Sequence, residues 1–202
     1  MVGPEIVVLI PESTRKTKGG SASPTVDELE GALPSPIRTK LRELRDEIAS
    51  KSPRGSVKGG GELAAYRRFD GNMYRHIPPD AWEGRSPRVE VIIASGLRGL
   101  VASRDKVPAY EHSMAEVTQP FGKLNRWWHG RGLPEILAAY LTAVRPRVVV
   151  DLLSLEYRES VAGYAARFRG IGVKTIDFPG MGRGSQPLRG ERVAEILRSG
   201  KV

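Results

Sequence analysis

Ile6-Val-Val-Leu-Ile10, close to the start of the chain, is an unbroken apolar run made mostly of β-branched residues. A short run of this kind, followed by Pro11 and a polar stretch, is typical of a strand that is buried on both faces of a sheet. Similar runs occur at Val89–Ala94, Val148–Leu153 and Val173–Phe178. We therefore predict a strand in each of these stretches.

Helical patterns separate the strands. Apolar residues recur at helical spacing over residues 36–50, and Pro36 suits the first turn of a helix because an N–H has no helical partner there. A second apolar stripe covers Ile136–Val144, and Ser154 is expected to cap a third helix that stops at Gly170. The alternation predicts an α/β fold with a mixed or partly parallel sheet and flanking helices.

The composition is that of one folded domain. With 40% hydrophobic and 27% charged residues, the chain can bury enough apolar surface to fold. Its length fits a single compact domain over residues 1–202, with a flexible Gly-rich segment at residues 52–61. No apolar run approaches the roughly 18 residues that span a bilayer, and the first residues lack a signal peptide's basic region and cleavage site. We expect a cytoplasmic protein with no membrane partner.

The absence of cysteine excludes disulfides, thiolate catalysis and cysteine-based metal sites. The histidines at positions 76, 112 and 129 show no i, i+4 pairing, which would place two metal ligands on one helix face. We therefore predict no structural metal and no cofactor.

The chain is strongly basic, with 32 Lys and Arg against 23 Asp and Glu and a net charge of +9. Such a charge attracts polyanions through long-range attraction and counterion release, which makes DNA the first candidate partner. Heat adaptation or genome bias would produce the same excess, because most of the cations are arginine and they are spread along the chain.

Small and polar residues follow the predicted strands at their carboxyl ends. Open α/β sheets bind their ligands in the crevice beyond these ends, so we expect one pocket there. The alternative is that strand ends are polar because they meet solvent. The residues concerned are Glu12, Ser13, Thr14, Ser95, Gly96, Asp151, Ser154 and Asp177.

Several blocks of the sequence combine glycine, aromatic and polar residues: Pro11-Glu-Ser-Thr-Arg-Lys-Thr-Lys-Gly-Gly20, Arg68-Phe-Asp-Gly-Asn-Met-Tyr74, Ala94-Ser-Gly-Leu-Arg-Gly-Leu100 with Asp105-Lys-Val-Pro-Ala-Tyr110, Leu124-Asn-Arg-Trp-Trp128 and Asp151-Leu-Leu-Ser-Leu-Glu-Tyr157. In this order they resemble the YaaA family, the peroxide stress proteins of bacteria. The resemblance spans most of the chain.

The resemblance implies a compact α/β domain with a basic cleft that binds DNA and limits oxidative (peroxide) DNA damage. The family places a helix-hairpin-helix where this chain has residues 36–66, and its hairpin would bring the amides of Gly59 and Gly61 to a DNA phosphate. The chain looks shorter than typical members here and over Arg183–Val202. The glycines also suit a plain linker.

Three groups of residues are candidates for the site. Acid–base or nucleophilic chemistry is expected from Asp70, Ser95, Asp151, Glu156 and Tyr157. Pocket walls are expected from Ser13, Thr14, Tyr74, Gly96, Asp105, Tyr110, Trp128 and Ser154. Contacts to nucleic acid are expected from Arg15, Lys16, Lys18, Lys58, Gly59, Gly61, Arg67 and Arg68. The alternatives are a solvated basic loop, carboxylates that shape turns, and an aromatic core.

These patterns leave three functions open. The first is a DNA-binding stress protein whose binding to duplex, damaged or branched DNA weakens with salt. The second is an enzyme that acts on a nucleotide or nucleobase, with a nucleotide-like small molecule as its ligand. The sequence lacks a P-loop, a dinucleotide fingerprint and a nucleophile elbow, so no reaction class follows. The third is a protein-binding scaffold, which a large exposed apolar patch would favour.

Overall fold

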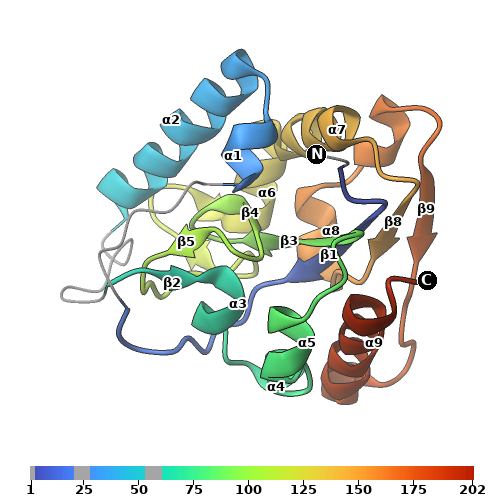
Figure 1. The fold of residues 1–202 in the computed structure, drawn as a ribbon. Coiled ribbons are helices and arrows are strands. Elements are labelled where there is room, and N and C mark those ends of the chain that lie inside the picture. Colours follow the sequence, from blue (N-terminus) through green and yellow to red (C-terminus); the bar gives the residue numbers. More distant parts are fainter. Residues whose placement is uncertain (1–2, 21–27, 53–60) are drawn as a thin grey trace.

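The structure is a computed structural model that describes residues 3–20, 28–52 and 61–202. The predicted flexible segment at residues 52–61 lies outside the described residues except at its two ends, as do Lys58 and Gly59. Figure 1 shows the described chain folded around a central sheet with helices on both sides.

The central sheet of the described residues is built from β1 Ile6–Pro11, β3 Val89–Ser95, β4 Gly99–Ala102, β8 Val148–Asp151 and β9 Gly172–Thr175. Its strand order is β4-β3-β1-β8-β9. All neighbours pair parallel except β3 and β4, which pair antiparallel. This mixed, mostly parallel sheet confirms the predicted fold class. Every residue of β1 is buried, because β1 is the central strand.

The strands differ from the prediction in several places, and β1 and β3 each end one residue later than predicted. β8 ends at Asp151, two residues early. β9 covers Gly172–Thr175 instead of Val173–Phe178, and all its residues are exposed because it forms the edge of the sheet. β4 was not predicted: Gly99, at a φ of +70°, closes a tight turn after Ser95 that folds the chain back onto β3.

Helices cover both faces of the sheet. They are α1 Glu28–Ala32, α2 Ser35–Lys51, α3 Ala65–Arg68, α4 Asn72–Arg75, α5 Pro79–Glu83, α6 Leu124–Gly130, α7 Leu133–Val144, α8 Leu155–Ser160 and α9 Ser185–Ser199. In Figure 1, α1, α2 and α7 lie above the sheet, and α4, α5 and α9 lie below it. The predicted helices over residues 36–50 and Ile136–Val144 correspond to α2 and α7. No helix of the described chain is long and apolar enough to cross a membrane.

Two other expected helices take a different form. Ser154 holds the N-cap position of α8, but its side chain makes no capping hydrogen bond, and the helix ends at Ser160 rather than Gly170. Gly163, at a φ of +83°, then turns the chain into a 3₁₀ turn at Tyr164–Arg167. After Gly61, the chain forms a short strand and the single turn α3 instead of the second helix of a helix-hairpin-helix.

Short ladders join the loops around the sheet. β2 Leu63–Ala64 pairs antiparallel with β5 Lys106–Val107. β6 Val117–Thr118 pairs antiparallel with β7 Gly122–Lys123, directly before α6. These ladders hold the segments that follow β1 and β3 at the carboxyl end of the sheet.

α9 packs against α4 through a glycine. A Cβ at Gly190 would lie 2.2 Å from the carbonyl oxygen of Met73 and 2.7 Å from Cβ of His76. Since this backbone can give way only if the two helices separate, we expect Gly190→Ala to lower the free energy of unfolding by about 1–3 kcal/mol. Gly31→Ala in α1 is the control, because nothing lies within 4 Å of its Cβ. Equal effects of the two substitutions in urea denaturation would contradict the close contact.

Candidate functional site

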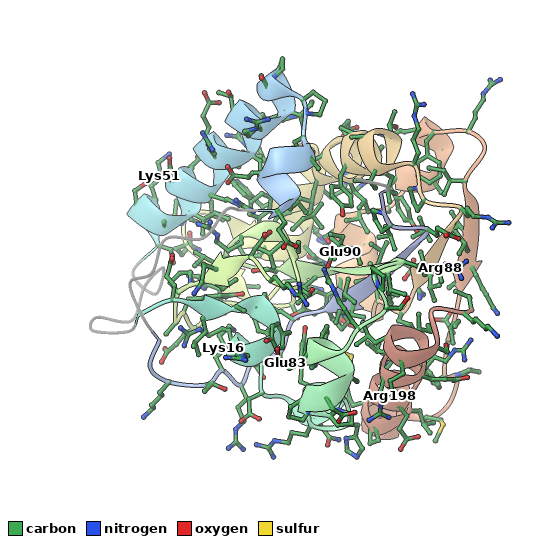
Figure 2. The ribbon with its side chains drawn as sticks, viewed as in Figure 1. Lys16, Lys51, Glu83, Arg88, Glu90 and Arg198 are labelled. Carbon is green, nitrogen blue, oxygen red and sulfur yellow. The ribbon has the colours of Figure 1, made fainter. Side chains whose placement is uncertain are left out.

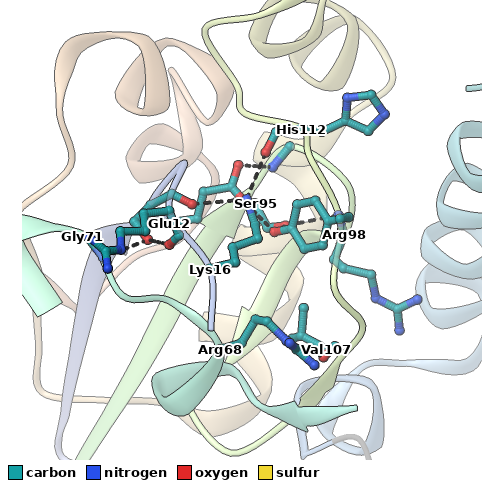
Figure 3. A network of polar contacts seen from close by, with 12 residues as sticks. Glu12, Lys16, Arg68, Gly71, Ser95, Arg98, Val107 and His112 are labelled. Atoms are coloured by element: carbon teal, nitrogen blue, oxygen red, sulfur yellow. Dashed lines mark hydrogen bonds and ion pairs between the residues drawn. The ribbon is translucent and has the colours of Figure 1, made fainter. Parts of the chain in front are cut away.

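Glu12 follows β1 directly, and its buried carboxylate lies at the carboxyl end of the sheet. Oε1 accepts a hydrogen bond of 2.7 Å from the backbone N–H of Gly96 and one of 3.4 Å from the hydroxyl of Tyr157. Oε2 accepts a hydrogen bond from the hydroxyl of Tyr110. Donors from three separate segments therefore hold this carboxylate in one position (Figure 3).

Lys16 is the cation that faces Glu12. Its Nζ lies 3.9 Å from Oε2 of Glu12 and donates hydrogen bonds to the carbonyls of Ser13 at 3.0 Å and His112 at 3.2 Å. Nζ also lies 4.0 Å from the centroid of the Tyr110 ring, within cation–π range. Burial lowers the pKa of Lys16 and raises the pKa of Glu12, and the charge of each opposes the shift of the other. In the structure, the ammonium of Lys16, a predicted contact to nucleic acid, is buried and paired with Glu12.

Further hydrogen bonds fix the groups around this carboxylate. Ser95 Oγ lies 2.7 Å from the hydroxyl oxygen of Tyr110, and the indole of Trp128 donates to the carbonyl of Gly96 at 2.8 Å. The hydroxyl of Tyr74 donates to the last carbonyl of β1 at 2.9 Å. Burial raises the pKa of Tyr74 and of Tyr110 well above the usual range, so both phenols stay protonated hydrogen-bond donors. The structure thus brings residues of all five sequence blocks together around the carboxylate of Glu12.

A pocket of about 410 Å³ lies beside this carboxylate, and we call it the Glu12 pocket. Its walls supply hydroxyl and amide groups, and none of the described residues that line it is cationic. The described lining offers hydrogen-bonding groups and no cation, so it favours an uncharged ligand with N–H and C=O groups. The polar lining residues are Glu12, Ser13, Thr14, Asn72, Tyr74, Ser113, Tyr157 and Gln186.

The other predicted carboxylates lie outside the Glu12 pocket. Asp151 pairs with Arg158 at 3.2 Å, and Asp105 accepts backbone N–H groups from Glu28 at the start of α1 at 2.6 Å and from Ala102 at 2.7 Å. Asp70 forms ion pairs in the loop before α4. Glu156 is half-buried in the first turn of α8 and does not line the pocket. Within the described residues, no three His, Asp or Glu side chains gather as a possible metal site.

Arg68 ties the loop after β1 to the rest of the fold. Its fully buried guanidinium donates hydrogen bonds to the carbonyls of Val107 at 3.1 Å, Gly19 at 2.9 Å and Gly61 at 2.6 Å, and also to that of Thr17. Each of its nitrogens is engaged, and no surface is left for a DNA phosphate. Arg68, a predicted contact to nucleic acid, is thus engaged within the fold, and sequence alone does not show that this arginine is buried.

The site differs in part from the sequence-based candidates. The structure brings Ser95 and Tyr157 to the same network, whereas Asp151 and Glu156 do not line the pocket. Glu12 belongs to the set of strand-end residues but not to the predicted chemistry. The sequence feature that points to Glu12 is its position as the first residue after the central strand. Gln186, which α9 contributes to the lining, had no such feature, because α9 is distant in sequence from β1.

A mostly parallel sheet with a polar pocket beyond the ends of its central strands defines an α/β protein with a strand-end site. A family model described as peroxide stress protein YaaA matches residues 25–186 of the chain. The chain therefore belongs to the peroxide stress protein YaaA family, and the resemblance found in its sequence blocks is confirmed. A search of the curated proteins finds no match. The family name supports a role in the peroxide stress response.

Proposed function

We propose that the protein acts in the cytoplasmic peroxide stress response by binding a nucleobase or nucleoside in the Glu12 pocket. One observation carries this proposal: the buried carboxylate of Glu12 is held by three donors that include Tyr157, and Glu12 and Tyr157 both line a pocket of about 410 Å³. A buried acid with a raised pKa at a concave pocket marks a candidate functional site.

The lining of the pocket supports an uncharged heterocycle as the ligand. A nucleobase edge alternates N–H donors with carbonyl and ring-nitrogen acceptors. The amides of Asn72 and Gln186 serve either kind of group. The ring of Tyr74 and the hydroxyl of Tyr157 complete the walls. A phosphate group would lie outside, because the only charged group among the described lining residues is negative.

Calorimetric titration with adenosine, guanosine, cytidine and thymidine tests this function without any contribution from phosphate. We expect saturable binding of at least one nucleoside, and an affinity about tenfold lower in Asn72→Ala, which removes one hydrogen bond to the ligand. Ser50→Ala on the exposed face of α2 is the control and is expected to bind like the unmodified protein. No binding of any of the four at about 10 mM would refute the proposal.

DNA binding is the second candidate, and the net charge of +9 favours it. Among the predicted contacts, Lys18 is exposed on the loop after β1. Arg15 and Arg67 are also exposed, but they pair with Asp70 and Glu83 at the surface. DNA would have to displace these carboxylates, which exposed arginines permit because surface ion pairs are weak.

Fluorescence anisotropy with duplex, overhang and bubble DNA at two salt concentrations tests this candidate. We expect affinity to fall as salt rises, and Lys18→Gln to lower the salt slope by about one if Lys18 contacts a phosphate. Absence of binding to all three DNA forms at about 50 mM salt would eliminate this function.

A further inference from the structure

A second hollow of about 420 Å³ lies next to the Glu12 pocket, and we call it the aromatic hollow. Tyr66 and Trp82 stack in its wall with ring centroids 5.4 Å apart and planes 30° apart. Tyr74 lines both the aromatic hollow and the Glu12 pocket. The two hollows therefore adjoin at Tyr74.

The backbone at Asp70 and Gly71 forms a ridge between the two hollows, and two arginines pair with Asp70 there. Asp70 lines the aromatic hollow and Gly71, the next residue, lines the Glu12 pocket. The carboxylate of Asp70 receives Nε of Arg15 at 3.0 Å and Nε of Arg75 at 3.2 Å. Both arginine side chains remain about half exposed or more, at 66% and 47%. Two guanidinium groups that converge on one carboxylate from solvent have the geometry that also binds a phosphate.

The charge around the aromatic hollow matches one phosphodiester. Arg67 and Arg75 line the hollow together with Asp70 and Glu83, and Arg15 adds a third cation at the ridge. These described residues sum to a net charge of +1. One phosphodiester neutralises this charge, whereas the Glu12 pocket carries a negative group and suits the uncharged base.

We propose that the Glu12 pocket and the aromatic hollow are two subsites of one groove that binds a dinucleotide unit of single-stranded nucleic acid. One base enters the Glu12 pocket, the next base stacks in the aromatic hollow, and the phosphate between them binds Arg15 and Arg75 in place of Asp70. This inference rests on the proposed nucleoside binding. Aromatic side chains stack on any base, so we expect the second subsite to bind all bases with similar affinity.

The test compares the tightest-binding nucleoside with the dinucleoside monophosphate made from two copies of it. We expect the dinucleoside monophosphate to bind at least about tenfold more tightly, with an affinity that falls with salt at a slope near −0.7 for one phosphate. In the double variant Arg15→Gln/Arg75→Gln, the ratio of the two affinities is expected to fall to about one.

Arg198→Gln is the matched control, because Arg198 is another half-exposed arginine that pairs with an aspartate, Asp80, at 2.7 Å. Arg198 lies on α9, well separated from Lys16 in Figure 2. In Arg198→Gln, the ratio of dinucleoside monophosphate affinity to nucleoside affinity is expected to equal that of the unmodified protein. Nucleoside binding without any gain for the dinucleoside monophosphate overturns the second subsite while the proposed function stands. A gain that survives in the Arg15/Arg75 variant also overturns it. No nucleoside binding refutes the proposed function itself.

Discussion

Replacing Arg68 by methionine is expected to lower the free energy of unfolding by about 3–5 kcal/mol. The methionine fills part of the space but donates no hydrogen bond, so the carbonyls of Thr17, Gly19, Gly61 and Val107 lose their partner. A buried carbonyl without a donor costs more than the same group in water. The loop after β1 is then expected to detach, and the Glu12 pocket loses one wall with it.

Arg67→Met is the matched control, since Arg67 is the preceding residue on α3 and its guanidinium is exposed. Its pair with Glu83 lies at the surface, where ion pairs contribute little to stability. Urea denaturation of the two variants measures the difference directly. Similar midpoints for Arg68→Met and Arg67→Met would show that the buried hydrogen bonds do not hold the loop.

Lys16→Met is expected to cost about 3–5 kcal/mol of stability at neutral pH, because it leaves the carboxylate of Glu12 buried without its cation. The double variant Glu12→Gln/Lys16→Met removes both charges and is expected to be more stable than Lys16→Met alone. The difference from additivity, measured in a double-mutant cycle, reports the coupling between the two side chains. A double variant less stable than Lys16→Met would contradict the coupling.

The loss of stability in Lys16→Met should become smaller as the pH falls. Burial already raises the pKa of Glu12 above its ordinary value of 4.5, and removal of the lysine raises it further. The folded state then holds a proton that the unfolded state releases, so stability falls as pH rises through the folded pKa. Lys16→Met should therefore come closest to the stability of the unmodified protein near pH 4.5, where Glu12 is protonated. A loss that does not shrink toward acid pH would show that the carboxylate is not the cause.

Much of the fold was predictable because it depends on local patterns. Apolar runs marked β1, β3 and β8, and helical periodicity marked α2 and α7. β4 and the break after α8 were not predictable from periodicity, since each depends on a glycine that takes a positive φ. Gly99 and Gly163 share that conformation, but a sequence pattern does not distinguish such glycines from those with negative φ.

For the site, the sequence by itself determined the family and the edge of the sheet at which polar groups gather. Parallel strands place their carboxyl ends at one edge of the sheet, so Glu12 and Ser95 had to lie near each other once β1 paired with β3. Only the tertiary structure decided which charges are buried. Lys16 and Arg68 look like any other basic residues of a polar loop, because net charge and spacing carry no information on burial.

The distinction has a physical reason. Strand and helix formation depend on residues a few positions apart, which a sequence displays directly. The hydrogen bonds of Arg68 and the pairing of Lys16 with Glu12 depend on the position of the loop after β1 relative to segments about 50 to 100 residues away. The same long-range packing places Tyr74 between the Glu12 pocket and the aromatic hollow, so the arrangement of the two hollows belongs to the tertiary structure alone.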